Sequence, residues 1–240
     1  VIYTALVTPE HALYLRLWRP DWEAFRNIFS LGLPIGLTLL AEVGLFSASA
    51  IMMGWIGTIE LAAHGIALQL ASLTFMIHLG LANAATIRAG RALGRRNMID
   101  LRRGALVATT LSALLALASV VLFISMAETL VGLFIDPADP ARPAVLAAGV
   151  ILLYVAALFQ LADAGQVLAL GLLRGLHDTR APMIFATISY WVVGVPVSYL
   201  LGFKLGFDGV GIWMGLVIGL MIAWIMMTTR FWRRVNRMVL

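Results

Sequence analysis

The chain has no cysteine, and charged residues make up only 12% of its 240 residues. The lack of cysteine excludes disulfide bridges, thiolate metal sites and cysteine nucleophiles. A soluble domain typically carries about 25% charged residues, so the shortage of charge argues against an ordinary globular protein. The sequence also lacks a glycine-rich phosphate loop, a zinc ligand set and a hydrolase nucleophile motif. We therefore predict neither an enzyme nor a bound cofactor.

Long apolar stretches are what the chain does have, since 62% of its residues are hydrophobic. Six runs each approach or exceed the roughly 20 residues that a helix needs to cross a bilayer. The runs are continuous and do not alternate, which favours helices over a barrel. The sequence predicts an all-α polytopic membrane protein, a six-transmembrane-helix bundle with spans at about 31–54, 61–86, 104–126, 144–172, 182–203 and 209–229.

The segments outside these spans are assigned from their composition. Residues 1–8 are predicted to be the end of a preceding transmembrane helix, because the run is apolar but too short to span. Residues 9–30 mix basic residues with tryptophans, which predicts a cytoplasmic or interfacial linker, with an ordinary loop leading into a helix as the alternative. Residues 31–229 form the six-helix lobe, and residues 230–240 form a basic cytoplasmic tail.

The basic residues indicate how the bundle is oriented. If successive connections alternate between the two sides, 15 of the 17 basic residues fall on one side. By the positive-inside rule this side, and the C-terminus with it, is cytoplasmic. Because the charges are spread over four segments as topology signals, binding of nucleic acid is not expected. The 15 are Arg16, Arg19, Arg26, Arg88, Arg91, Arg95, Arg96, Arg102, Arg103, Arg174, Arg180, Arg230, Arg233, Arg234 and Arg237.

Two acids, Glu42 and Asp163, lie inside predicted spans. A charged side chain at the centre of a bilayer costs roughly 2.5–3.5 kcal/mol on insertion scales, so such residues usually serve a function. Gln160 and Gln166 lie three residues to either side of Asp163, and Thr38 lies one turn from Glu42, on the same helical face in each case. Carboxylates with amides and hydroxyls suit a hard monovalent cation or a proton. The alternative is that one acid is neutral or paired and only holds helices together.

Proline and glycine positions predict how the helices bend and pack. Pro34 interrupts the hydrogen bonding of the first span and is a candidate hinge. Glycines four residues apart, at Gly32 and Gly36, at Gly171 and Gly175, and at Gly211, Gly215 and Gly219, are expected to let helix backbones approach closely in lipid.

Five aromatic residues are predicted to have structural roles. His64 and His78 are more consistent with hydrogen-bonded packing than with a ligand. Trp55, Trp213 and Trp232 lie near span ends and are interpreted as interface anchors.

Three stretches together resemble a known transporter family. They are LPIGLTLLAEVGLFSASAIMMGWIG (Leu33–Gly57), LAAHGIALQLASLTFMIHLGLANAATIRAGRALG (Leu61–Gly94) and FQLADAGQVLALGLLRGLHDTRAPM (Phe159–Met183). They resemble the second half of multidrug and toxic compound extrusion (MATE) transporters of the NorM type. The resemblance implies that the chain is one lobe of a twelve-helix MATE fold, whose N-terminal lobe is missing from this sequence.

The same resemblance implies a function. In the family, Na⁺ or H⁺ drives export of organic cations and other drugs across the bacterial inner membrane by alternating access. The acids implicated in cation binding match Glu42 and Asp163 here. Two departures bear on the ion: His78 stands where members often carry proline, and Phe159 stands where some carry tyrosine.

Three alternatives remain open. A lipid-linked oligosaccharide flippase of the same superfamily would be expected to carry basic residues within its spans to meet pyrophosphate, and none is predicted there. A membrane-embedded enzyme would need a catalytic set near an interface, and none is visible. A non-transporting membrane fragment or scaffold is the third.

Overall fold

The computed structural model describes residues 20–239, with the Val239 side chain left out, and every regular element in that range is helical. Six helices are long and apolar enough to cross a membrane. This confirms the predicted all-α, six-span architecture. The spans are α2 (Trp22–Ile56), α3 (Thr58–Gly94), α4 (Met98–Ser125), α6 (Arg142–Gly175), a composite fifth span (Arg180–Lys204) and α9 (Asp208–Val239). A short helix, α5 (Ala127–Gly132), follows α4.

Both ends of the described chain are more helical than the sequence indicated. The predicted linker reached residue 30, but α2 begins at Trp22. Asp21 caps the helix there, because its carboxylate accepts a hydrogen bond from the Ala24 amide at 2.9 Å. Residues 1–19, with the predicted end of a preceding helix, lie outside the described range. The predicted basic tail continues α9 as far as Val239.

The composite fifth span changes helix type along its length. It comprises α7 (Arg180–Thr187), the π-helix η2 (Ile188–Gly194), α8 (Val195–Tyr199) and the π-helix η3 (Leu200–Lys204). Pro196 lies just after η2 and has no amide hydrogen to donate. A wider turn next to a proline relieves the clash of its ring with the preceding turn, which accounts for η2.

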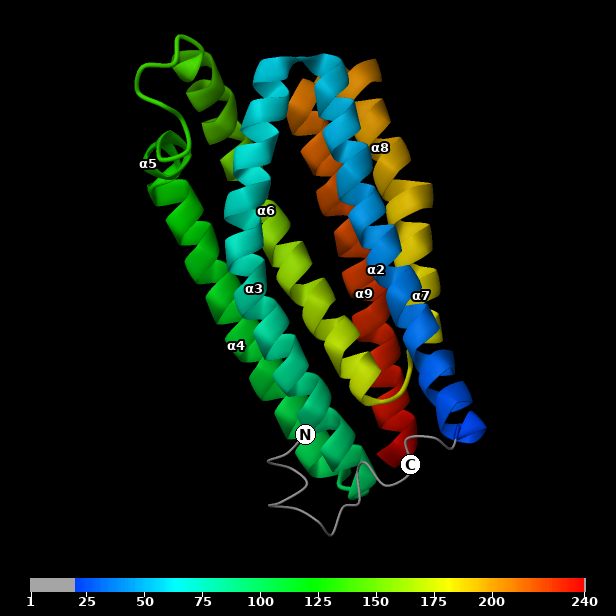
Figure 1. Cartoon of the computed structure of the whole chain (residues 1–240). Coiled ribbons are helices and arrows are strands. Elements are labelled where there is room, and N and C mark those ends of the chain that lie inside the picture. The colour runs from blue at the N-terminus through cyan, green and yellow to red at the C-terminus, as the bar shows by residue number, and fades with distance from the viewer. Residues whose placement is uncertain (1–19, 240) are drawn as a thin grey trace.

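Helix α6 is the centre of the bundle and packs against α3, α4 and α9 (Figure 1). Glycines allow the closest of these approaches. A Cβ atom on Gly171 would lie 2.7 Å from the Ala82 carbonyl oxygen, and one on Gly175 would lie 2.6 Å from that of Thr86. The Thr86 hydroxyl also donates to the Gly171 carbonyl oxygen at 2.7 Å. This glycine pair therefore makes the predicted close helix contact.

The other predicted glycine pair makes no such contact. Nothing within the described residues comes within 4 Å of a Cβ built on Gly32 or Gly36. Both line an open apolar groove of about 400 Å³ on the outer face of α2. The expectation that they pack against another helix is wrong for the described part of the chain, because α2 lies at the edge of the bundle.

One end of the bundle gathers the basic segments. Figure 1 shows the start of α2, the turn between α3 and α4, the connection from α6 to α7 and the C-terminal end of α9 at the same end. Helix α5 and the turn between α2 and α3 lie at the opposite end. The alternation of loops inferred from charge is thus the alternation that the helices adopt.

Candidate functional site

The two intramembrane carboxylates, on different helices, line one cavity. Glu42 comes from the middle of α2 and Asp163 from the middle of α6, and both face a cavity of about 440 Å³ between α2, α3 and α6. Asp163 is 2% exposed, whereas Glu42 is partly exposed. The two acids are close enough to interact electrostatically. The structure therefore brings together the two residues that the sequence selected separately.

The rest of the cavity is mostly apolar, with aromatic rings on two sides. Phe46 and Phe159 meet edge to face, with ring centroids 6.0 Å apart. Phe75 adds a third ring, and Gln69 and Ser72 supply polar groups from α3. Neither Gln69 nor Ser72 was predicted as a site residue. A signal existed, because they lie three apart on one face of a predicted span.

Thr38, Gln160 and Gln166 are all buried, but they do not line this cavity. The hydroxyl of Thr38 donates to the Pro34 carbonyl oxygen at 2.8 Å, one turn back along α2. The Gln160 amide nitrogen donates to the Ala71 carbonyl oxygen at 3.2 Å and to the hydroxyl of Thr74, which joins α6 to α3. Among the described residues, the Gln160 side-chain oxygen and both polar atoms of Gln166 lack a hydrogen-bond partner.

A basic residue that sequence reasoning missed also belongs to this region. Arg174 was assigned to a loop, but it lies in the last turn of α6 and is partly buried. Its Nε and Nη2 atoms are buried without a hydrogen-bond partner in the described chain. The guanidinium interacts electrostatically with Glu42 and with the buried side chain of Tyr190 on η2. The sequence did not reveal this interaction with Glu42, because a basic residue at the end of a span is ordinarily read as part of a loop.

The position of Trp213 in the structure differs from the one predicted. It is fully buried, so its interpretation as an interface anchor is wrong. Its ring packs against Phe159, with centroids 5.5 Å apart, and its indole nitrogen donates to His64 at 3.1 Å. Gly211 and Gly215 on the same helix abut the fifth span, which draws the start of α9 into the bundle.

The remaining predicted residues, Pro34 and His78, lie away from the carboxylates. Pro34 is buried within α2, which continues through it as one helix. His78 is buried in α3, where its Nδ1 lies 3.2 Å from the Ser112 hydroxyl of α4. Neither residue lines the cavity.

The two carboxylates do not belong to a larger cluster of metal-binding side chains in the described chain. Within residues 20–239, no three side chains of the histidine, aspartate and glutamate types gather closely enough to hold a metal ion. Two carboxylates remain, and no hydrogen bond from the described chain stabilises either one. Oxygen ligands of this kind suit a hard monovalent cation, and buried carboxylates can also take up protons.

A cluster at the basic end of the bundle is separate from the cavity. Asp178, between α6 and α7, is 5% exposed and accepts from Arg230 Nε at 2.7 Å. Arg234 Nη1 lies at 2.7 Å from the same oxygen. Burial alone would raise the pKa of Asp178, but the hydrogen bonds and positive charges of the two arginines outweigh it and hold that pKa below its ordinary value. The cluster ties α9 to the connection after α6.

Comparison with known proteins gives consistent matches. Residues 34–200 match the MatE family. The chain is 46% identical over 236 residues to the probable multidrug resistance protein NorM of Agrobacterium fabrum, covering 98% of this chain and 51% of the relative. Against the protein of the same name in Rhizobium meliloti, it is 47% identical over 225 residues, covering 94% and 48%. The chain thus spans about half the length of these relatives.

Solved structures show the same fold. A crystal structure of MATE in the bent conformation matches with a TM-score of 0.83 at 22% identity, covering 94% of this chain and 49% of that one. A structure described as the outward-facing conformation of a multidrug resistance MATE family transporter matches with a TM-score of 0.82 at 23% identity, covering 94% and 49%. Members of this family are transporters and not enzymes. The chain, a multi-pass membrane protein with six candidate spanning helices in residues 20–239, belongs to the MatE family.

Proposed function

We propose that the chain is one six-helix lobe of a secondary antiporter of the bacterial inner membrane. The antiporter exports organic cations and similar drugs in exchange for Na⁺ or H⁺, and the C-terminus of the lobe is cytoplasmic. One observation carries the proposal: Glu42 and Asp163, on different helices, line the same cavity. Two carboxylates in a mostly apolar cavity are costly unless a cation or proton joins them.

The coupling step follows from the repulsion between these two acids. With both ionised, α2 and α6 carry like charges that face a common cavity of low polarity. A cation between them, or a proton on one of them, removes that repulsion and favours a conformation in which α2 lies closer to α6. Pro34, eight residues before Glu42, gives α2 a position at which it can bend. Only a difference in cation affinity between the two conformations can drive the change.

The drug is held by the apolar part of the lobe. Phe46, Phe75 and Phe159 give the cavity aromatic walls next to the two acids. Aromatic faces and carboxylates attract lipophilic cations, the first through cation–π contacts and the second through charge. Because the chain spans about half the length of its relatives, the second wall of the transport path comes from a partner N-terminal lobe.

Of the alternatives, the flippase gains no support from the buried basic residue. Arg174 is a partly buried basic side chain in the last turn of α6, and its charge acts on Glu42. A guanidinium balanced by a carboxylate is a poor receptor for pyrophosphate. The proposal therefore stays with a cation-coupled exporter.

Efflux by the full-length transporter carrying this lobe is the direct test. Glu42→Gln and Asp163→Asn each remove a charge with little change in shape, and each should abolish most of the cation-driven drug efflux. Glu128→Gln, at an exposed position at the start of α5, is the matched control and should leave efflux unchanged. Unchanged efflux in both site variants would sink the proposal. A sodium and pH series on the unmodified protein identifies the ion.

A further inference from the structure

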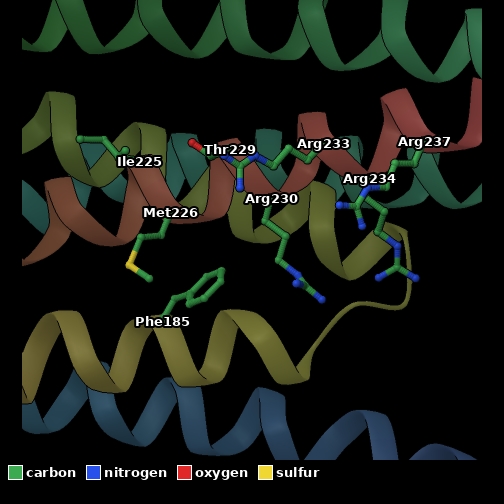
Figure 2. Close-up of a pocket in the computed structure, with 8 residues that line it drawn as sticks. All are labelled: Phe185, Ile225, Met226, Thr229, Arg230, Arg233, Arg234 and Arg237. Atoms are coloured by element: carbon green, nitrogen blue, oxygen red, sulfur yellow. The ribbon is translucent and has the colours of Figure 1, made fainter.

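A second cavity, of about 560 Å³, lies between α7 and the C-terminal part of α9 (Figure 2). It is distinct from the cavity of the two carboxylates and shares no lining residue with it. Four arginines occupy one part of its wall, and apolar side chains occupy the other. The lining residues are Phe185, Ile225, Met226, Thr229, Arg230, Arg233, Arg234 and Arg237.

The arginines form a row on one face of α9. Arg230, Arg233, Arg234 and Arg237 are spaced three, four and seven residues from the first, which places them on one side of a helix. Asp178 pairs with two of them, Arg230 and Arg234. Four guanidiniums and one carboxylate leave a formal charge of +3. In residues 20–239, no carboxylate lies within ion-pair distance of Arg233 or Arg237.

The ion pairs with Asp178 also prepare the wall of the cavity. They fix two guanidiniums at 2.7 Å from one buried carboxylate, so these side chains have less rotational freedom left to lose when a ligand arrives. Arg233 is exposed and keeps its guanidinium available beside them. The cavity therefore combines ordered and available donors for an anion.

The apolar part of the cavity lies on the N-terminal side of the arginines along α9, toward the middle of the span. Figure 2 shows Phe185, Met226 and Ile225 at one end of the group and Arg234 and Arg237 at the other. Ile225 is 57% exposed, on a helix that is apolar enough to cross a membrane. Its exposed side chain therefore lies at the level of the hydrocarbon when the helix spans a bilayer. An acyl chain can follow this apolar part while its headgroup lies at the arginines.

We propose that this cavity binds an anionic phospholipid, with the phosphate at Arg233 and Arg237 and an acyl chain against Phe185 and Ile225. Basic pockets between transmembrane helices at one membrane face are suited to lipid phosphates. A free inorganic anion would use the arginines but leave the apolar wall without a role. The site lies at the end of the bundle where the basic segments gather, which fits the headgroup level of a spanning helix (Figure 1).

Lipid retention by the purified full chain tests the proposal, and it needs no transport activity. The chain is reconstituted in nanodiscs of phosphatidylcholine containing phosphatidylglycerol, and the phosphatidylglycerol carried over into detergent is quantified by native mass spectrometry. The double variant Arg233→Gln/Arg237→Gln removes two charges and leaves the Asp178 ion pairs intact. A juxtamembrane arginine contributes about 1 kcal/mol to binding of acidic lipid, so affinity should fall roughly 10- to 30-fold.

The matched control is Arg95→Gln/Arg103→Gln, which removes two exposed charges, one from the α3–α4 turn and one from the start of α4, at the same end of the bundle. It should retain phosphatidylglycerol like the unmodified chain. An equal loss in both double variants would mean a diffuse charge effect and would overturn the site. Displacement of the lipid by millimolar inorganic phosphate as effectively as by phosphatidylglycerol would overturn the assignment to a lipid. Equal retention of phosphatidylcholine and phosphatidylglycerol would overturn the role of charge.

Discussion

The indole nitrogen of Trp213 donates a hydrogen bond to Nδ1 of His64 at 3.1 Å. An indole N–H can only donate, so Nδ1 must be the unprotonated nitrogen and a neutral His64 carries its proton on Nε2. Nε2 lies 3.5 Å from the Ser49 hydroxyl, which itself donates to the Phe46 carbonyl oxygen at 2.7 Å. These contacts join α9, α3 and α2, and they support the same Phe46 and Trp213 that pack against Phe159. His64 is thus a structural residue that holds one side of the candidate site.

Trp213→Phe should destabilise the chain by about 2–4 kcal/mol, because it leaves Nδ1 of His64 buried without a donor and opens a small void. The change in the free energy of unfolding is measured by denaturant titration of the purified chain in detergent. Trp55→Phe is the control, since Trp55 is 66% exposed and should change stability by less than about 1 kcal/mol. Equal effects of the two variants would contradict a structural role for the pair.

Gly171→Ala and Gly175→Ala should each destabilise the lobe by about 1–3 kcal/mol. A Cβ at either position would lie within 2.7 Å of a carbonyl oxygen of α3, so α3 and α6 would have to separate. Gly36→Ala places the same methyl group where no atom of residues 20–239 comes within 4 Å, and alanine is the better helix former. That control should be neutral or stabilising when the three variants are compared by the same denaturant titration. A stable Gly175→Ala would refute the close contact.

Asp178→Asn should lower stability at neutral pH by about 1–3 kcal/mol, the usual range for a buried hydrogen bond to a charged group. The pKa of Asp178 is below its ordinary value of 3.8 in the folded chain. The stabilisation is therefore fully present above pH 3.8 and is lost as the pH falls through the lower folded value. The difference in Tm between the unmodified chain and the variant should be constant from pH 8 to about pH 5 and narrow only in stronger acid.

The control for that experiment is Asp100→Asn. Asp100 pairs with Arg88 at 3.2 Å, but the two side chains are 41% and 58% exposed. Solvent-exposed pairs contribute about 0–1 kcal/mol, so this variant should differ little from the unmodified chain at any pH. A Tm difference for Asp178→Asn that already narrows near pH 6 would contradict the lowered pKa.

Arg174→Gln should tighten binding of the coupling cation. The positive charge of Arg174 acts on Glu42, so it opposes a second positive charge arriving there. Its removal should lower the cation concentration for half-maximal efflux by roughly 2- to 10-fold, the scale of one partly screened charge. Arg180→Gln, at an exposed position six residues later, is the control and should leave that concentration unchanged. A rise in the required concentration would show that Arg174 assists the cation.

The six spans were predictable because apolar length and loop charge are properties of the sequence alone. Glu42 and Asp163 were predictable for the same reason, since an acid in an apolar run is conspicuous wherever the helices lie. The sequence did not reveal that Gln160 bonds to α3 while Gln69 and Ser72 line the cavity. That distinction depends on how each helix is rotated about its axis, which only packing determines.

Two of the failures occurred near helix ends. Arg174 and Trp213 both lie within a few residues of a predicted boundary, where composition favours loops and interfacial anchors. Helix α6 continues past its predicted end at residue 172, and the Arg174 side chain there is partly buried, whereas Trp213 lies inside α9 and is fully buried. The glycine row on α9 is a signal that Trp213 is buried, because helices that pack through glycines bring neighbouring side chains into the interface.

The glycine row of α9 also has a mechanical consequence. Gly211, Gly215 and Gly219 meet the backbone of the fifth span directly, with a Cβ on Gly215 reaching 2.4 Å from the Ser198 amide. Two helices whose backbones are in direct contact cannot slide past one another without a steric clash. We therefore expect α9 and the fifth span to move together as one rigid body. Helix α2 is held by fewer contacts, because only 17% of its most apolar stretch is buried within the described lobe, against 56% for α9. Within the described lobe, α2, the helix that carries Glu42, is therefore the helix that can move most easily relative to the others.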